Sequence, residues 1–534
     1  MKCSATGLNF TRTALEITQL SASLRAAYVA SLDAIAQSPD RTFAATFGRL
    51  AAADDTIAEV SAEATLHALV AAEPERRAAG AAAKKELQDM FSAAYGRRDV
   101  YDVLQAAASE SDNYAADATE SRIASRYLAL WTANGMALRD TADRTAVAEK
   151  SAAIATLAAE FEQAINEDTT AVSFDPDADL VGVPASLIDS LPRDASDPTK
   201  VLVGCKASQM TPVLQTCTVE ATRKRLHLAA TTRCPENMER LATLVRLRGE
   251  SAQLLGHPNH AARALAVKMA LTPEATHAFL DGVAAKLETR LADDLRELSA
   301  VKASLLAPST AATDDLAPRV NAWDITFLSA AMKKQLGVDE ERIKTYFPAA
   351  HVVPTAVTMV AALLGCEATA RTDGAAWHES CEIFEITNKT VDDDGTDPVV
   401  GYVVLDLVTR PNKFGHQMVV PLRPALPDAF DGPRPPVCSV LGNLGDERGL
   451  LRFREVETLL HELGHVFHAL CGDRGHSILS WSWPIVPWPG GVTMVCVWCF
   501  LLFSRVWLLS SHLFPSPSSS LHDALRIFSR CRAC

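Results

Sequence analysis

The hydrophobic pattern of the chain is clearest between residues 454 and 471, where apolar side chains recur three and four positions apart. The apolar positions are Val456, Leu459, Leu460, Leu463, Val466, Phe467 and Leu470. Residues at this spacing share one side of an α-helix, so the pattern predicts a helix with one buried face. Gly472 follows, and glycine commonly ends helices. We therefore predict a helix over 454–471.

Helical patterning also dominates residues 12–167 and 219–307. Both segments are rich in Ala, Leu, Glu, Arg and Lys, which have high helix propensity. Residues 172–215 differ, because proline-containing turn signals interrupt them, and there we predict turns and short strands. A mostly polar connector over 308–315 begins with proline, as expected after a helix end.

A third pattern occupies residues 380–422, where short runs rich in β-branched residues predict a small sheet. The runs are Cys381–Ile386, Val399–Val408 and Gln417–Pro421. Val391–Gly395 lies between the first two runs and has the composition of a hairpin turn. The patterns together predict a mainly helical fold with a small sheet directly before the helix at 454–471.

The composition is consistent with two or three domains or one large helical body. The chain has 534 residues, of which 48% are hydrophobic, so it can bury a sizeable core. Its net charge is −14 and no basic patch stands out, which argues against nucleic acid as the main partner. We interpret the charge as a solvated acidic surface, and an acidic cleft that favours basic peptides is the alternative.

The cysteines and the N-terminal residues indicate a cytoplasmic protein. Cysteines from Cys3 to Cys471 are scattered without the spacing of a disulfide framework, as is typical of reduced thiols. Residues 1–20 contain charged side chains and lack the apolar core of a secretory signal. A mitochondrial location is the alternative.

The predicted helix contains the sequence His461-Glu462-Leu463-Gly464-His465, an HExxH motif. On a helix, residues i and i+4 share one face, so both imidazoles can reach one zinc ion. The intervening Glu462 can then act as general base on a water molecule. A sheet beside such a helix also has a known use, because zincins hold the substrate backbone on an edge strand. An ordinary structural hairpin is the alternative reading of that sheet.

A third zinc ligand cannot be identified from the sequence. Catalytic zinc needs three protein ligands and an open position for water. The metzincin pattern would require a histidine at Cys471, and from Val466 to Cys534 there is no glutamate. Only Asp473 and Asp523 offer carboxylates in that stretch, and neither is well placed.

Separated motifs along the chain, from about residue 15 to residue 472, match those of one protein family. They are Asn166–Thr170, Glu220–Lys224, Leu254–His257, Trp323-Asp324, Tyr346-Phe347-Pro348, Trp377-His378, Leu405-Asp406-Leu407 with Arg410, Lys413, Phe414, Gly415 and His416, and Glu455–His465 with His468 behind it. This set resembles the thimet oligopeptidase and neurolysin family of zinc peptidases.

The resemblance implies an almost wholly helical, two-lobed body with a narrow channel that admits short unstructured peptides. It implies endopeptidase activity on oligopeptides, usually in the cytosol, with one Zn²⁺ ion per chain. Carried over by position, His461 and His465 are the metal ligands and Glu462 is the catalytic base. His468 has no ligand role in the family, and we expect it to be a packed, hydrogen-bonded histidine. We expect a monomer with short peptides as partners.

The chain departs from the family pattern after the predicted zinc helix. The family continues with a Gly-Thr loop and a second helix that carries the ligand glutamate, whereas this chain has a Trp- and Pro-rich stretch with Gly490 near the expected ligand position. The tyrosines that stabilise the oxyanion in the family are also absent. We therefore expect that the reading frame left the family sequence near residue 474, and that 474–534 is not part of the family fold.

Two other interpretations of the tail remain open. Residues 492–509 are largely apolar and suggest a membrane segment, but Arg505 interrupts them. Cys496-x-x-Cys499 and Cys531-x-x-Cys534 are two CxxC pairs, which suggest a zinc ribbon despite their long separation.

The expected organisation is an N-terminal helical region over 1–170, a peptidase region over 171–473 and an atypical tail over 474–534. Two functions remain open for this organisation. One is a zinc metalloendopeptidase that cleaves short oligopeptides. The other is a catalytically impaired relative that binds peptides without cleaving them, because the third ligand glutamate is absent.

Overall fold

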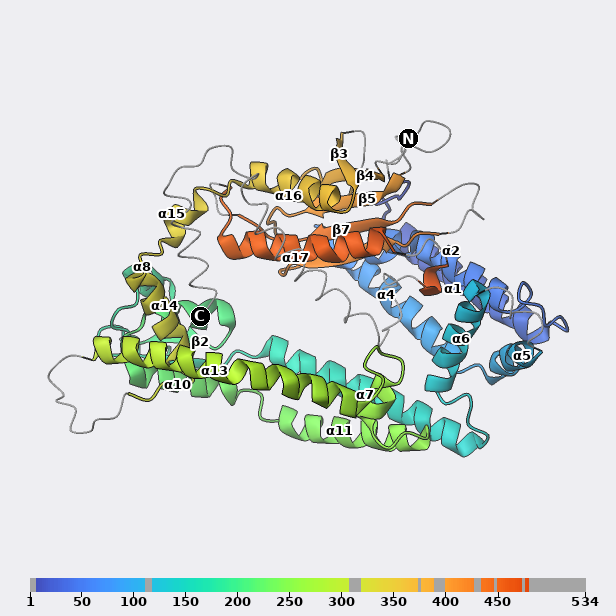
Figure 1. Ribbon diagram of the computed structural model, residues 1–534, viewed down its shortest axis with the longest axis horizontal. Helices are drawn as coiled ribbons and strands as arrows, with labels where there is room; N and C mark the ends of the chain where they lie inside the picture. Colours follow the sequence, from blue (N-terminus) through green and yellow to red (C-terminus); the bar gives the residue numbers. More distant parts are fainter. Residues whose placement is uncertain are drawn as a thin grey trace. The chain divides into compact units, whose positions relative to one another are not determined.

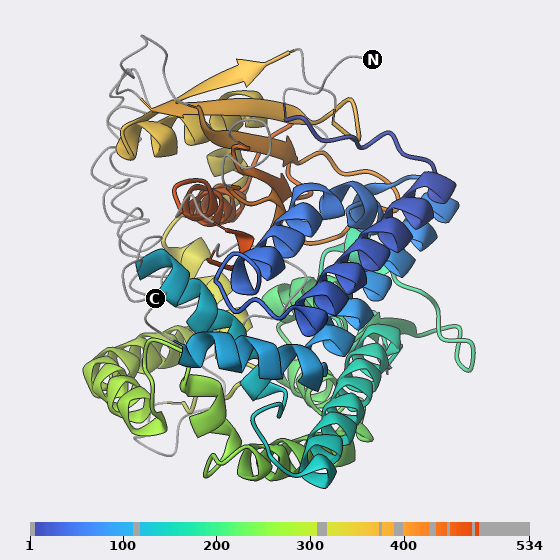
Figure 2. The same cartoon turned by 90° about the vertical axis from the view of Figure 1, so that its right-hand side faces the viewer.

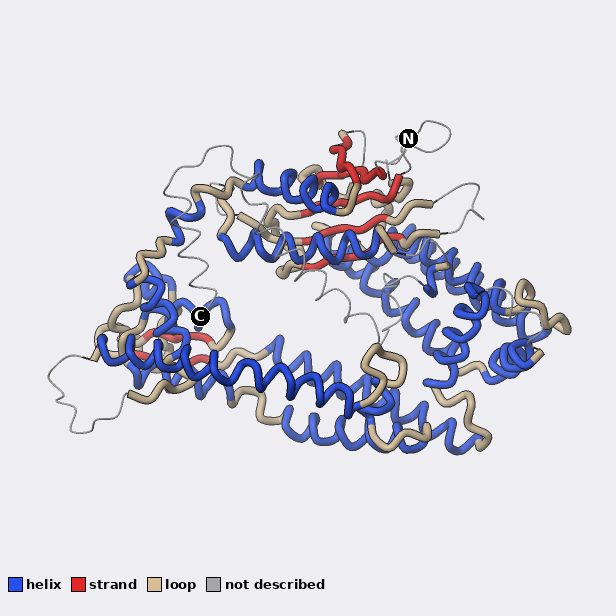
Figure 3. Tube along the Cα trace, viewed as in Figure 1, coloured by secondary structure: helices blue, strands red, loops and turns tan. Residues whose placement is uncertain are grey.

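The computed structural model describes residues 6–110, 118–306, 318–372, 376–388, 399–426, 434–445, 449–472 and 476–479. The chain is mainly helical with a small sheet, which confirms the predicted fold class (Figure 3). The described residues form two compact units. Unit 1 comprises the residues described within 1–148, 267–269 and 340–513, and unit 2 those within 149–266 and 270–339.

Unit 1 combines an N-terminal set of helices with the five-stranded sheet (Figure 1). Its elements are α1 (Ala14–Gln37), α2 (Phe47–Thr65), α3 (His67–Val70), α4 (Pro74–Tyr95), α5 (Arg98–Ser109), α6 (Ala118–Ala133), α15 (Glu340–Lys344), α16 (Ala349–Leu363), β3 (Cys366–Arg371), β4 (Glu382–Asn388), β5 (Val399–Asp406), β6 (Met418–Arg423), β7 (Val437–Leu441), α17 (Phe453–Leu470) and the 3₁₀ turn η2 (Ser477–Leu479).

Aromatic side chains fill the centre of the N-terminal helices. Tyr28, Phe47, Tyr127 and Trp131 are almost completely buried in one cluster. Ile478 of η2 packs into the same cluster, so the short segment that follows α17 rests on the N-terminal helices.

The sheet has the strand order β3-β4-β5-β7-β6. All neighbours pair antiparallel except β5 and β7, which pair parallel. The three predicted runs correspond to β4, β5 and β6. The predicted turn at Val391–Gly395 lies outside the described residues.

Two further strands, β3 and β7, were not predicted from the sequence. All five residues of β7 are buried, because the strand is central and covered on both faces. Such a strand lacks the alternation of apolar and polar residues that marks a half-exposed strand. Strand β3 is an edge strand with the mixed sequence Cys-Glu-Ala-Thr-Ala-Arg, whose alanines and charged residues give only a weak strand signal.

Helices α16 and α17 pack against the sheet through one shared core (Figure 2). From α17 this core includes Leu459, Leu463, Val466, Phe467 and Leu470, which are members of the predicted apolar face. Gly401 on β5 allows the close approach of the helix, because a Cβ there would lie 2.7 Å from Leu470 Cδ2. The helix begins and ends within one residue of its predicted limits, and most of its predicted apolar face packs against the sheet.

Unit 2 is built from helices around a two-stranded antiparallel sheet. Its elements are most of α7 (Thr141–Glu167), β1 (Ala171–Phe174), α8 (Ala185–Ser190), β2 (Val201–Gly204), α9 (Ala207–Thr216), α10 (Glu220–Thr231), α11 (Asn237–Leu254), α12 (His260–Leu265), α13 (Pro273–Leu305) and α14 (Ile325–Gln335). The segment 172–215 contains the predicted short strands but also the short helices α8 and α9, which its turn signals concealed.

A buried ionic cluster joins two of the family motifs inside unit 2. Asp324 is fully buried and accepts hydrogen bonds from Arg223 at 2.8 Å and from Lys302 at 2.8 Å. Trp323 Nε1 donates to Glu220 Oε1 at 3.1 Å. The motifs at 220–224 and 323–324 therefore stabilise the helical unit together.

Candidate metal centre

The two histidines of the HExxH motif converge on one point beside α17. His461 Nε2 and His465 Nε2 lie 3.1 Å apart, and the ring centroids are 4.8 Å apart at an interplanar angle of 74°. A tetrahedral zinc ion with Zn–N distances of about 2.0–2.1 Å holds two ligand nitrogens about 3.3 Å apart. The observed pair therefore fits two ligands of a single zinc ion.

Burial gives His465 the protonation state that a metal ligand needs. Desolvation, reinforced by the neighbouring His461 and His468, lowers the pKa of His465 to about 4. Burial also lowers the pKa of His468, one turn further along the helix. A neutral imidazole has a free lone pair for a metal, so His465 is ready to bind one at neutral pH without first losing a proton.

Glu462 lies between the histidines in sequence and faces strand β6. The side chain is half-buried, and burial raises the pKa of its carboxyl, while His461 and the backbone N–H of Val419 lower it. Val419 is the second residue of β6, which among the described strands pairs only with β7 and so lies at the edge of the sheet. The motif thus places a half-buried carboxylate beside a strand at the edge of the described sheet.

The contact with Val419 was not predicted from the sequence. A backbone N–H group carries no signature in the side-chain sequence, and the strand reveals it only once it is folded beside α17. The nearest signal was the run at Gln417–Pro421, which predicted a strand but not which of its amides would face the helix.

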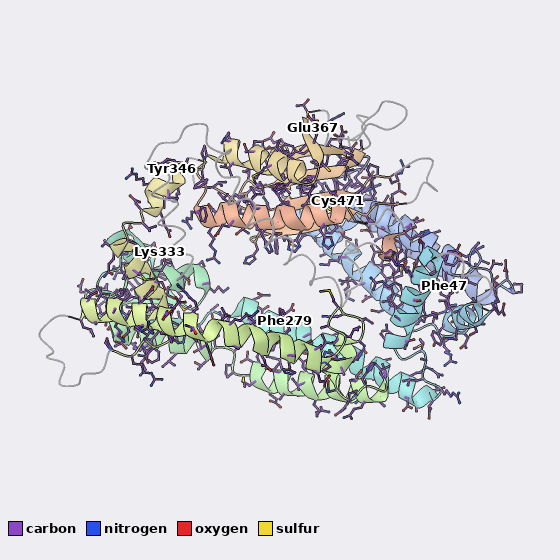
Figure 4. All side chains as sticks on the ribbon, viewed as in Figure 1. Phe47, Phe279, Lys333, Tyr346, Glu367 and Cys471 are labelled. Atoms are coloured by element: carbon purple, nitrogen blue, oxygen red, sulfur yellow. The ribbon has the colours of Figure 1, made fainter. Side chains whose placement is uncertain are left out.

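A third ligand does not emerge among the described residues. No group of three or more His, Cys, Asp or Glu side chains in this part of the chain is arranged to hold a metal ion. Cys471, labelled in Figure 4 at the end of α17, is exposed. Asp473, Asp523 and Gly490 lie outside the described residues.

The segment described after α17 contacts the N-terminal helices through a partly buried pair, His476 with Asp55. His476 Nδ1 lies 2.6 Å from Asp55 Oδ2, and the Ser477 amide donates to Asp55 Oδ1 at 2.7 Å. Asp55 is fully buried in α2. The hydrogen bond to Asp55 raises the pKa of His476. A lone histidine in an irregular segment gave no sign of this contact at the sequence level.

None of the helices in the described ranges combines the length and apolar character needed to cross a membrane. The apolar run at 492–509 and the two CxxC pairs lie outside these ranges.

With this geometry in view, comparison with known proteins identifies the class of protein. A model of peptidase family M3 matches residues 213–488, more than half of the chain, and the chain therefore belongs to peptidase family M3. This confirms the resemblance drawn from the motifs. The matched range runs past residue 473, and the division into regions at that point stays a prediction.

Curated relatives of the chain are oligopeptidases. The chain is 25% identical over 484 residues to the thimet-like oligopeptidase of Dictyostelium discoideum, an alignment that covers 89% of this chain and 71% of that protein. It is 27% identical over 328 residues to oligopeptidase A of Escherichia coli, covering 57% of this chain and 46% of that protein. It is 26% identical to saccharolysin of Saccharomyces cerevisiae over 65% of this chain and 50% of the relative. The chain thus spans about half the length of the latter two.

Among solved structures, a putative oligoendopeptidase F from Bacillus anthracis aligns with a TM-score of 0.36 and 12% identity. The alignment covers 88% of this chain and 66% of that one.

Proposed function

We propose that the chain is a zinc-dependent endopeptidase of the oligopeptidase type, which cleaves short peptides. The observation that carries the proposal is the convergence of His461 Nε2 and His465 Nε2 to 3.1 Å, with Glu462 between them. Membership in peptidase family M3 supports the same conclusion.

The proposed roles follow from the contacts of each side chain. His461 and His465 would hold one Zn²⁺ ion through their Nε2 atoms. When bound, zinc supplies Lewis-acid polarisation of the scissile carbonyl and of water. Glu462 takes a proton from the attacking water and delivers it to the leaving amine. Burial raises the pKa of Glu462, and a base with a raised pKa holds the transferred proton better than a solvated carboxylate does.

The backbone N–H of Val419 helps to orient the base. It faces the Glu462 carboxyl closely enough to lower the pKa of that group. An oriented carboxylate loses less freedom when the reaction begins.

The second candidate is a peptide-binding relative that does not cleave. It is favoured by the lack of glutamate from Val466 to Cys534 and by the lack of a three-residue metal cluster in the described ranges. Two histidines alone bind zinc more weakly than three ligands do, and they do not complete the set that catalytic zinc normally has.

Cleavage of a short quenched fluorescent peptide separates the two candidates. The endopeptidase proposal expects turnover that a chelator abolishes and added Zn²⁺ restores. Glu462→Gln should lower kcat by about 10²-fold or more, because general-base catalysis typically contributes 10²–10⁴-fold. Peptide binding of the unmodified chain without turnover, measured by fluorescence anisotropy, would instead support the second candidate.

We also propose a cytoplasmic monomer that acts on short peptides and does not bind nucleic acid. Mitochondrial location stays the alternative. The acidic net charge of −14 supports the exclusion of nucleic acid, because a backbone of phosphates repels such a surface. Sedimentation of the purified chain tests the monomer.

A further inference from the structure

One family motif, Asp406 with Arg410 and Lys413, has no part in the proposed chemistry, yet it forms a densely bonded ionic cluster in the described part of unit 1. Asp406 is the last residue of β5 and is fully buried. Its carboxylate accepts Arg410 through both oxygens, at 2.5 and 2.7 Å, and Trp377 Nε1 at 2.7 Å. A cluster this well satisfied holds the local backbone firmly.

Lys413 extends this cluster to the ends of two strands. Its side chain is 0% exposed, and its ammonium lies 2.8 Å from Asp406 Oδ1 and 2.8 Å from the Asp406 carbonyl oxygen. It also donates to the carbonyl oxygens of Val408 and Gly442. Gly442 directly follows β7, so one buried ammonium ties the end of β5, the end of β7 and the loop 407–417 together.

The loop held by Lys413 leads directly into strand β6. Gln417, at the far end of this loop, packs closely on Gly442. A Cβ at Gly442 would lie 2.9 Å from Gln417 Cγ. Two more bonds fix its middle: the Phe414 amide donates to Leu69 O at 2.9 Å, and Asn443 Nδ2 donates to Phe414 O at 2.8 Å. Among the described strands β6 pairs with β7 alone, and helices α2 and α17 also lie against it. The loop is therefore a further constraint on where β6 begins.

We propose that Lys413, seated on Asp406, is a positioning residue that fixes the start of β6 and so places this strand, whose Val419 packs on the core shared with α17, beside Glu462. The inference rests on the proposed role of Glu462 as base. The described contacts of Lys413 include neither the histidines nor Glu462, and five residues of backbone separate Lys413 from Val419.

Lys413→Met tests the proposal, because methionine keeps much of the side-chain volume and removes the ammonium. Asp406 keeps its paired bonds to Arg410, so the buried carboxylate is not left alone. Lys302→Met is the matched control, since it removes a comparable buried lysine from Asp324 in unit 2.

Hydrogen exchange resolved to short segments provides a readout that does not depend on activity. Lys413→Met should speed the exchange of the amides of 414–420 by about 10- to 100-fold, as expected when charged hydrogen bonds are lost. Amides of α17 and β4 should change little. Glu462→Ala should speed exchange at Val419 while leaving 414–417 unchanged. Unaltered exchange at 418–420 in Lys413→Met, or an equal rise throughout unit 1, would overturn the proposal.

Kinetics and metal content complete the test. Lys413→Met should lower kcat about 10- to 100-fold with KM and bound zinc nearly unchanged, since a base displaced by about an ångström loses catalysis rather than binding. Lys302→Met should leave kcat within a few-fold of the unmodified chain. A loss of kcat matched by equal loss of folded protein would contradict positioning. If the unmodified chain cleaves no peptide, the proposed function fails, and the exchange of 414–420 and of Val419 still decides whether Lys413 places β6.

Discussion

At the scale of single residues, the closest comparison in the site is between His465 and His468. Both histidines are half-buried on α17, three positions apart, and burial lowers the pKa of each. Only His465 brings its Nε2 to 3.1 Å from that of His461. We therefore propose that the two histidines differ in whether the ring points toward His461, and not in burial or charge.

Zinc affinity measured by competition with a chromophoric chelator should separate the two histidines. Removal of an outer hydrogen-bond partner of a metal ligand typically lowers metal affinity about 10- to 100-fold. His465→Gln removes one of the two proposed ligands themselves, so we expect a larger loss of zinc affinity. His468→Gln should stay within that smaller range. Equal losses in both variants would mean that His465 is not a ligand.

At the scale of elements, the fit between α17 and the sheet depends on the absence of a side chain at Gly401. A Cβ there would lie 2.7 Å from Leu470 Cδ2 and 2.8 Å from the backbone oxygen of Pro436. The leucine tip can shift, but the carbonyl belongs to the chain entering β7. Helix and strand must therefore separate if the glycine is replaced.

Gly401→Ala should destabilise unit 1 by about 1–3 kcal/mol, the usual cost of overpacking a filled core. Gly249→Ala is the opposite case, because the position lies inside α11 with nothing within 4 Å of a Cβ. That variant should stabilise by about 0.5–1 kcal/mol, since alanine is the better helix former. Urea unfolding midpoints measure both, and a neutral Gly401→Ala would show that the helix is not held that closely.

These elements also show how far the sequence could be interpreted. The apolar face of α17 follows a period of 3.6, so its helix and its buried side could be predicted from Val456 to Leu470. Strand β7 could not, because complete burial removes alternation. The HExxH histidines could be paired from spacing alone. The Val419 amide and the Asp55–His476 pair could not, because both depend on contacts between segments that only the folded chain brings together.

At the scale of the whole molecule, α2 holds two adjacent buried aspartates, Asp54 and Asp55, that have different partners. Burial raises the pKa of Asp54 to about 7, and Tyr127 donates to it at 2.6 Å. Asp55 instead pairs with His476. Protonated Asp54 and protonated His476 are thus the forms that the fold prefers.

Both groups have folded-state pKa values above their unfolded values, so both favour folding at low pH and lose that contribution as pH rises. Asp54 loses it between about pH 4 and 7, and His476 above about pH 6.5, its unfolded value. Unfolding midpoints measured from pH 4 to 9 should therefore show a smaller decline in Asp54→Asn over the lower interval and in His476→Gln over the upper one. Because Asp55 and His476 lie 421 positions apart, the second interval reports whether the segment after the proposed zinc helix stays on the N-terminal helices. Curves for His476→Gln and the unmodified chain that stay parallel above pH 6.5 would show that this pair does not hold the segment in place.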